Sequence, residues 1–181
     1  MKMQAALLVV VASLVAGCGG KAAGNDGGSA GDGGAAGSIG TAAFTGGFNG
    51  SAPCAVTITQ PASGSWVIGS AGSAIAGTPY GWTGFHMAND GTATPGVYDQ
   101  TDSTGTSTGA TNLTTGTPSW NAAFGQGAAI GSFDLSLSSL GTGSDLAGGG
   151  TLYAEPHGGI VATLVDGSAT PQPDVMLSLT F

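Results

Sequence analysis

Basic side chains are almost absent from this sequence. Lys2 and Lys21 are the only lysine or arginine residues, against ten aspartate and glutamate residues, and the formal net charge is −8. Nucleic acids are held through cationic contacts to phosphate, and arginine is the residue that binds phosphate and carboxylate groups bidentately. The composition therefore predicts no nucleic-acid partner, disfavours an enzyme that uses nucleotides, and indicates partners that are neutral or cationic.

An apolar run long enough to cross a membrane is also missing. The run over residues 5–15 holds about a dozen residues, whereas a transmembrane helix needs about 20. With Lys2 before it, this run fits the apolar region of a signal peptide, which is removed on export. Val15, Ala16, Gly17 and Cys18 then stand where an ordinary cleavage site would be expected.

These four residues resemble the lipobox of bacterial lipoproteins, in which diacylglycerol alkylates the cysteine thiol and the chain is cut just before it. The resemblance implies a signal peptide over residues 1–17 and lipidation at Cys18, the mature N-terminus. It also implies that the protein is located in the bacterial cell envelope and that a membrane is its first partner. Two acyl chains are enough for stable attachment to that membrane. Gly19, where an aspartate would retain the protein in the inner membrane, favours the outer membrane. The alternative is an ordinary secreted protein in which the cysteine is incidental.

Residues 19–40 are rich in Gly, Ala, Ser and Asp and lack aromatic residues and apolar periodicity. Such a composition cannot bury enough apolar surface to order itself, and a flexible coil of this length spans roughly 25 Å. The sequence therefore predicts a lipidated cysteine and flexible tether over residues 18–40, followed by one folded domain over residues 41–181.

The domain shows almost no helix signal. Gly or Pro recurs about every ten residues, and three segments alternate apolar and polar side chains in the manner of half-buried strands. Their predicted inward residues are Cys54, Val56, Ile58, Phe133, Leu135, Leu137, Val175, Leu177, Leu179 and Phe181. Further strands are predicted over residues 66–69, 73–85, 97–99, 120–124, 150–154 and 160–165.

This pattern predicts an all-β fold, either an antiparallel β-sandwich or a barrel. We expect the sandwich and leave a jelly-roll or Ig-like topology open. Without lysines to protect strand edges, β-bulges are expected at glycines such as Gly84 and Gly158. Lipobox, tether and the C-terminal meander together make the sequence similar to glycine-rich lipoproteins predicted from myxobacterial-type genomes, a resemblance that assigns no functional residue.

Cys54 is the second of only two cysteines. If Cys18 is lipidated, Cys54 provides either a buried thiol or an intermolecular bond. The strand pattern that begins at Cys54 favours the buried thiol. A Cys18–Cys54 disulfide would require the lipobox interpretation to be wrong.

No catalytic residue and no cofactor are predicted. Ser107 lies in a G-x-S-x-G string, but the nucleophile elbow needs a strand before the serine and a helix after it, and the Ser/Thr/Gly-rich surroundings predict a loop. His86, Glu155 and His157 are zinc-ligand types without zinc-ligand spacing. Calcium is a candidate ion at Asp90, Asp99 and Asp102, whose oxygens fall in one loop-rich segment, although surface carboxylates are the default.

The aromatic residues offer the remaining candidate site. Trp66, Tyr80, Trp82 and Trp120 could form an exposed platform for sugar rings, which needs no cationic residue. Large aromatic side chains are more commonly core fillers. The function expected is a lipid-anchored envelope or surface β-sandwich with a non-enzymatic structural or interaction role and a glycan or envelope protein as partner. The alternatives are a carbohydrate-binding module that uses the aromatics and, third, an envelope hydrolase.

Overall fold

The computed structural model describes residues 38–102, 105–112, 119–124, 131–168 and 170–181. Every strand pairing within these residues is antiparallel, and none of the described residues is helical. No apolar helix of membrane-spanning length occurs in this part of the chain. The predicted all-β, sandwich-like architecture is therefore confirmed.

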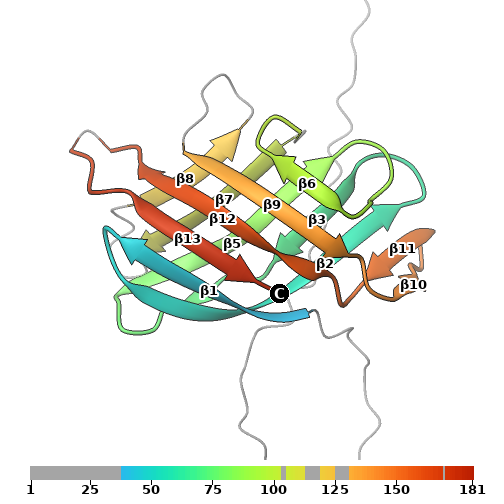
Figure 1. Ribbon diagram of the computed structural model, residues 1–181, viewed down its shortest axis with the longest axis horizontal. Coiled ribbons are helices and arrows are strands. Elements are labelled where there is room, and N and C mark those ends of the chain that lie inside the picture. Colours follow the sequence, from blue (N-terminus) through green and yellow to red (C-terminus); the bar gives the residue numbers. More distant parts are fainter. Residues whose placement is uncertain (1–37, 103–104, 113–118, 125–130, 169) are drawn as a thin grey trace, which may run out of the picture.

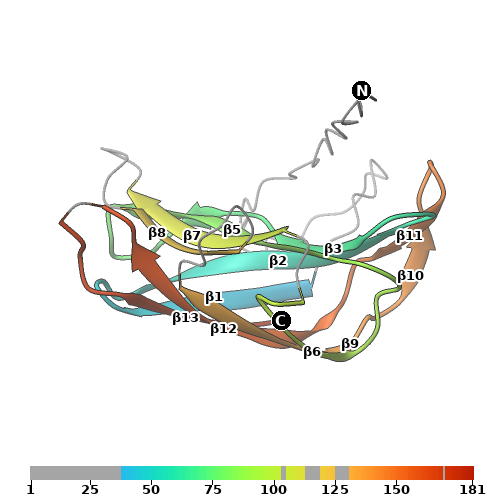
Figure 2. The ribbon, with the colours of Figure 1, turned by 90° about the horizontal axis from the view of Figure 1, so that it is seen from above.

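Two layers of strands face each other (Figure 2). The front layer contains β1 (Ser38–Gly46), β13 (Val175–Thr180), β12 (His157–Asp166), β9 (Ser132–Ser139) and β6 (Gly96–Asp99), in that spatial order. The back layer contains β2 (Gly50–Pro61), β3 (Trp66–Ser70), β5 (Tyr80–Asn89), β7 (Gly105–Asn112) and β8 (Ser119–Phe124). Three short strands, β4 (Ser73–Ala74), β10 (Gly143–Asp145) and β11 (Gly150–Tyr153), extend the back layer.

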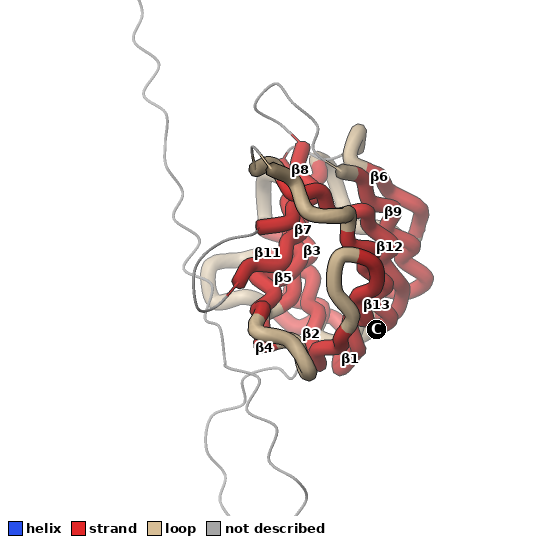
Figure 3. Tube along the Cα trace, turned by 90° about the vertical axis from the view of Figure 1, so that its left-hand side faces the viewer, coloured by secondary structure: helices blue, strands red, loops and turns tan. Residues whose placement is uncertain are grey.

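Hydrogen bonding continues from one layer into the other on both sides of the sandwich. On one side, β1 pairs with β13 along one edge and with β2 along the other, and Figure 3 shows β1 at this junction. On the other side, β12 pairs with β9 along most of its length and then with β8 at Val165 and Asp166. β1 and β12 therefore connect the two layers through continuous strand pairing.

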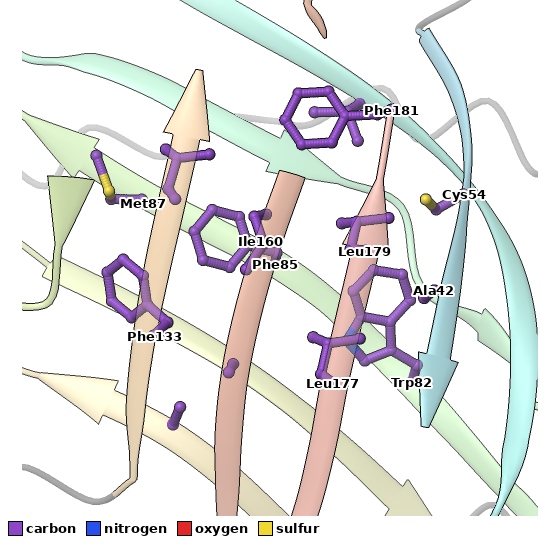
Figure 4. Packing of buried hydrophobic residues seen from close by; sticks show 14 of the residues in the cluster. Ala42, Cys54, Trp82, Phe85, Met87, Phe133, Ile160, Leu177, Leu179 and Phe181 are labelled. Atoms are coloured by element: carbon purple, nitrogen blue, oxygen red, sulfur yellow. The ribbon is translucent and has the colours of Figure 1, made fainter. Parts of the chain in front are cut away.

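A single apolar core fills the space between the layers (Figure 4). Along β13, Val175, Leu177 and Leu179 are buried while the residues between them are exposed, and β9 follows the same alternation. Burying a large aliphatic or aromatic side chain contributes about 1.5–3 kcal/mol. The alternation predicted for these strands is confirmed, as is the burial of the Cys54 thiol, which is 1% exposed.

Besides the three-residue β10, two longer strands were not predicted. β1 begins at Ser38, so the last three residues assigned to the tether belong to the sheet, and β7 occupies the segment expected to be a loop. Both strands are built mainly from Gly, Ala, Ser and Thr, which carry little apolar signal. Each is paired along both edges. β1 pairs with β13 and β2, whereas β7 pairs with β5 and β8. Neighbouring strands therefore supply the stabilisation that the local sequence does not.

The predicted strand over residues 73–85 is interrupted. β4 and β5 are separated by a turn in which Gly77 has a φ of 78° and the Thr78 hydroxyl donates to the carbonyl of Ile75 at 3.0 Å. A positive φ is accessible to glycine without a steric penalty. The segment therefore makes a sharp turn where one continuous strand was predicted.

Both predicted bulges are present. The β5–β7 register shifts between Trp82 and Gly84, and the β12–β9 register shifts between His157 and Gly158. A Cβ atom on Gly84 would collide with the backbone oxygen of Ser70, and one on Gly158 would collide with that of Ser136. Glycine is therefore required at both positions by close backbone approach.

The two chain ends of the domain lie side by side, near the lower edge of the view in Figure 1. Thr41 near the start of β1 pairs with Thr180 near the end of β13, and the Phe181 amide donates to the carbonyl of Gly158 at 3.1 Å. We call this the tether end. The opposite end, called the distal end, contains the β1–β2 turn over residues 47–49 and the β12–β13 loop, described at residues 167–168 and 170–174.

Candidate functional site

The outer surface of the front layer carries a shallow hollow of about 250 Å³. Four neighbouring strands line it, and the outward-facing residues around it are small, aliphatic or acidic. They are Val97 from β6, Asp134 and Ser136 from β9, Gly159 and Val161 from β12, and Ser178 and Thr180 from β13.

The register of the sheet explains why the surface is hollow at this point. Ser136, Gly159 and Thr180 stand opposite one another on three adjacent strands. The central position of this row has no side chain, and a Cβ atom there would lie 3.2 Å from the backbone oxygen of Leu179. Gly159 therefore leaves a gap between the hydroxyl-bearing residues on either side.

Two aliphatic side chains stand at the hollow unusually exposed to solvent. Val97 is 74% exposed and Val161 is 52% exposed. They flank the gap from β6 and β12, respectively. The surface of the hollow is mainly apolar, although Asp134, Ser136, Ser178 and Thr180 are among the residues that line it.

The electrostatics of this surface are dominated by two carboxylates. Asp134 stands directly opposite Asp99 in the β6–β9 ladder, and like charges in such a position repel. The Thr101 hydroxyl and amide both donate to Oδ1 of Asp99 at 2.6 Å, which lowers the pKa of that carboxyl and keeps it ionised. No lysine or arginine occurs after Lys21, so the domain supplies no basic side chain to neutralise the pair.

Asp102 closes the end of β6. Its carboxylate accepts a hydrogen bond from the Asp99 amide at 2.9 Å, and its own amide donates to the Asp99 carbonyl at 3.2 Å. Both backbone polar groups of Asp99 are thereby used within the turn. Among the described residues β6 pairs only with β9, and this turn shortens the edge that another strand could join.

The predicted calcium ligands are divided between two places. Asp99 and Asp102 share the turn after β6, whereas Asp90 follows β5 and accepts a hydrogen bond from the Ser65 hydroxyl at 2.7 Å. Across the described ranges, no group of three or more His, Cys, Asp or Glu residues is arranged to hold a metal ion, including His86, Glu155 and His157. The structure therefore lends no support to a calcium site or a zinc site.

The tryptophans predicted as a glycan platform are in the core. Trp66, Trp82 and Trp120 are 1%, 3% and 1% exposed, and Tyr80 is half-buried against the core. Figure 4 shows the Trp82 indole pointing into the core beside Leu177. The exposed-platform prediction is therefore wrong for the three indoles, because closing the end of a small sandwich uses these large rings as packing.

Most of these rings gather near the distal end, in what we call the distal aromatic cluster. Its members are Phe44, Phe48, Tyr80, Trp82 and Trp120, with ring centroids of contacting pairs 4.8–5.8 Å apart. The Trp120 indole nitrogen donates to the Pro173 carbonyl at 2.9 Å. Trp66 packs separately, against Tyr98 at 5.2 Å.

A buried carboxylate that the sequence did not single out organises the loop over this cluster. Asp166 is 3% exposed and accepts hydrogen bonds from the Ser168 amide, the Ser168 hydroxyl and the Gln172 amide at 2.9–3.0 Å. These donors, the Gln172 amide foremost, lower the pKa of Asp166. The loop so fixed brings the Pro173 carbonyl to Trp120, which makes Asp166 a structural residue.

Ser107 lies within β7, where its backbone stands opposite His86 of β5 and Ala123 of β8. The prediction of a loop at this serine is therefore wrong. The strand–turn–helix geometry of a nucleophile elbow is not formed there either. His86 is exposed on the outer face of the back layer, and partial loss of water around its ring lowers its pKa. Cys18 and the preceding signal segment lie outside the described residues.

Comparison of the chain with protein-family models, curated proteins and solved structures gave no match. The hollow, the turn after β6 and the distal aromatic cluster are therefore interpreted from their own geometry and chemistry.

Proposed function

We propose that this protein is a lipoprotein of the bacterial envelope. A lipid on Cys18 holds it to a membrane, in keeping with the outer membrane favoured by Gly19, and residues 19–37 separate the folded domain from that membrane. The domain has a structural or interaction role and carries out no reaction. Its partner is a component of the envelope surface.

The observation that carries this proposal is the place where the fold begins. The first strand starts at Ser38, directly after the Gly-rich segment, and is paired along both edges. This order along the chain is the one expected of an anchored protein. The lipobox provides the anchor, the Gly-rich segment provides the spacer, and the paired first strand begins the displayed domain. Because β1 enters the sheet at the tether end, the distal end and both outer faces stay accessible to a partner.

The residues that suggested glycan binding or hydrolysis lie in positions that do not support either function. The glycan-binding alternative depended on exposed indoles, and those indoles are buried. The hydrolase alternative depended on Ser107 in an elbow, and Ser107 lies inside a strand paired on both sides. An interaction role depends on neither feature.

The test is acylation of Cys18, measured by mass spectrometry of the mature N-terminus and by partition of the protein between detergent and water. We expect a diacylglyceryl group and an added acyl chain on Cys18, and recovery of the protein in the detergent phase. Cys18→Ser is expected to abolish both results. Cys54→Ala, which removes the other cysteine, is the matched control and should retain the lipid. Recovery of an unmodified wild-type Cys18 in the aqueous phase would overturn the proposal.

A further inference from the structure

We propose that Met176, on the outer face of the front layer, is a modification site that takes up one oxygen atom from a peroxide, and that Thr163 selects which epimer of the sulfoxide forms. The inference goes beyond the proposed function and holds whether or not Cys18 carries a lipid. It is drawn from the exposure of one sulfur atom, from the hydrogen bond that this sulfur accepts and from the residues on the strands beside it.

One sulfur atom of the domain differs from the others in its exposure to solvent. The sulfur-containing side chains of residues 38–181 are Cys54, Met87 and Met176. Cys54 and Met87 are 1% and 0% exposed, and Figure 4 shows both among the core side chains, whereas Met176 is 42% exposed. Oxidation requires contact between the sulfur and the oxidant, so susceptibility follows exposure. Met176 therefore carries the sulfur that a peroxide in solvent reaches without any opening of the fold.

The strand pattern places Met176 away from the core. Its neighbours in β13, Val175 and Leu177, are buried. The other outward residues of this strand, Ser178 and Thr180, carry hydroxyl groups. Methionine is a flexible apolar side chain that commonly fills irregular gaps in a core. Because Met176 points outward instead, a polar oxygen added to its sulfur stays outside the core.

The sulfur of Met176 accepts a hydrogen bond from a threonine. Thr163 stands directly opposite it in the β12–β13 ladder, and the Thr163 Oγ1 hydroxyl donates to Sδ at 3.4 Å. A thioether sulfur is a weak acceptor with two lone pairs, and each lone pair gives a different sulfoxide epimer when an oxygen atom bonds to it. The hydrogen bond occupies one lone pair, so the other attacks the peroxide. Thr163 thereby biases the chirality of the product.

The reaction balances with the peroxide as its only co-reactant. The free lone pair of Sδ forms a bond to one oxygen of hydrogen peroxide as the O–O bond breaks. The departing hydroxide takes the proton of the transferred oxygen and leaves as water. The sulfur is oxidised by two electrons and the peroxide is reduced by two. The product is methionine sulfoxide, a polar and chiral side chain that reductases convert back to methionine.

The strands on both sides of Met176 provide donors for the new oxygen. Thr45 of β1 and Thr163 of β12 each stand directly opposite Met176. Residues in such positions have Cβ atoms about 4.5–5.5 Å apart, and each threonine hydroxyl offers one donor. A sulfoxide oxygen is a stronger acceptor than a thioether sulfur. The modification therefore makes this part of the outer face polar while the core is left as it was.

The experiment treats the full mature protein with hydrogen peroxide and follows oxygen uptake by peptide mass spectrometry. We expect the Met176 peptide to gain one oxygen atom at least about tenfold faster than the Met87 peptide, because Met87 reacts only when the core opens. Met176→Leu is the matched control, since leucine is close to methionine in volume and holds no sulfur. This variant should gain no oxygen in the corresponding peptide and should leave Met87 resistant. Oxidation of Met87 as fast as Met176, or a Met176 that stays unmodified, would overturn the inference.

A second measurement tests the part assigned to Thr163. After digestion, the oxidised Met176 peptide is treated with two sulfoxide reductases, each of which acts on one epimer. We expect one epimer in about threefold excess, as a weak hydrogen bond would produce. Thr163→Val, which removes the hydroxyl and keeps the branched shape, should give nearly equal amounts, whereas Thr163→Ser should retain the excess. Equal epimers in the wild type, or an excess that persists in Thr163→Val, would overturn the selection by Thr163.

The lipid on Cys18 is measured separately in the same digest. An unmodified Cys18 together with rapid oxidation of Met176 would overturn the anchor and leave the modification site assigned. An acylated Cys18 together with a resistant Met176 would overturn the modification site and leave the anchor assigned.

Discussion

The distal end and the outer face of the front layer use their side chains in opposite ways. At the distal end, five aromatic rings pack against one another beneath a loop fixed by a buried carboxylate. On the outer face, two valines and two opposed aspartates stand in solvent around a glycine. The residues most conspicuous in the sequence therefore stabilise the fold, and the groups available to a partner are small and inconspicuous ones.

The largest effect on the free energy of unfolding is expected from a comparison of the buried Trp120 with the exposed Val97. Trp120→Ala should lower the free energy of unfolding by about 3–5 kcal/mol, because it removes a buried indole from the distal aromatic cluster. Val97→Ala, on the outer face, should change it by no more than about 0.5 kcal/mol. Urea unfolding followed by circular dichroism measures both. Similar losses in the two variants would mean that the outer face carries core-like packing and that the contrast is false.

The next test asks whether Asp166 holds the distal loop through its charge. Asp166→Asn should lower the melting temperature by several degrees, because the amide is uncharged and accepts hydrogen bonds at only one of its two positions. Asp174→Asn is the control, since Asp174 is exposed in the same loop. The folded-state pKa of Asp166 is below its ordinary value, so its stabilisation is present above about pH 4 and is lost as the pH falls through the folded pKa. The difference between wild type and Asp166→Asn should therefore shrink in acid, and a constant difference would assign the effect to shape alone.

A smaller effect is expected on the back layer, at His86. Its folded-state pKa lies below the ordinary value of about 6.5, so between these two values the unfolded chain binds more protons than the folded one. Stability should therefore increase as the pH rises through this window, and be lowest below it. His86→Gln should flatten the dependence of melting temperature on pH in the window just below about pH 6.5, with His157→Gln as the control. An unchanged slope in the His86 variant would show that its ring is solvated as freely in the fold as in the unfolded chain.

The smallest expected change has the opposite sign. Asp134→Asn should raise the melting temperature by about 1–3 °C, because it relieves the repulsion from Asp99 across the ladder. Added salt should remove most of this gain by screening the pair. Thermal unfolding at low and high ionic strength measures the effect. A loss of stability at both salt concentrations would show that Asp134 is needed by the fold itself rather than left available to a partner.

The sequence predicted what depends on local pattern. Alternation marked the buried sides of β9 and β13, and glycine was the signal for the bulges at Gly84 and Gly158, although both bulges lie in interior strands rather than at sheet edges. β1 and β7 were missed because their Gly, Ala, Ser and Thr residues become strands only through neighbours distant in the sequence. The hollow could not be predicted, since it exists only because the register sets Gly159 between Ser136 and Thr180. The exposed or buried state of an aromatic residue depends on the same long-range pairing.

The position of β1 has a mechanical consequence. Its ladders to β2 and β13 run along the strand from Ser38 to Gly46, so a pull on the N-terminal side of Ser38 acts along the strand axis. If the far side of the domain is held, that pull loads both ladders in shear, and their hydrogen bonds must fail together instead of opening one after another. A domain entered through such a strand resists extraction by force far better than its modest size and glycine content suggest.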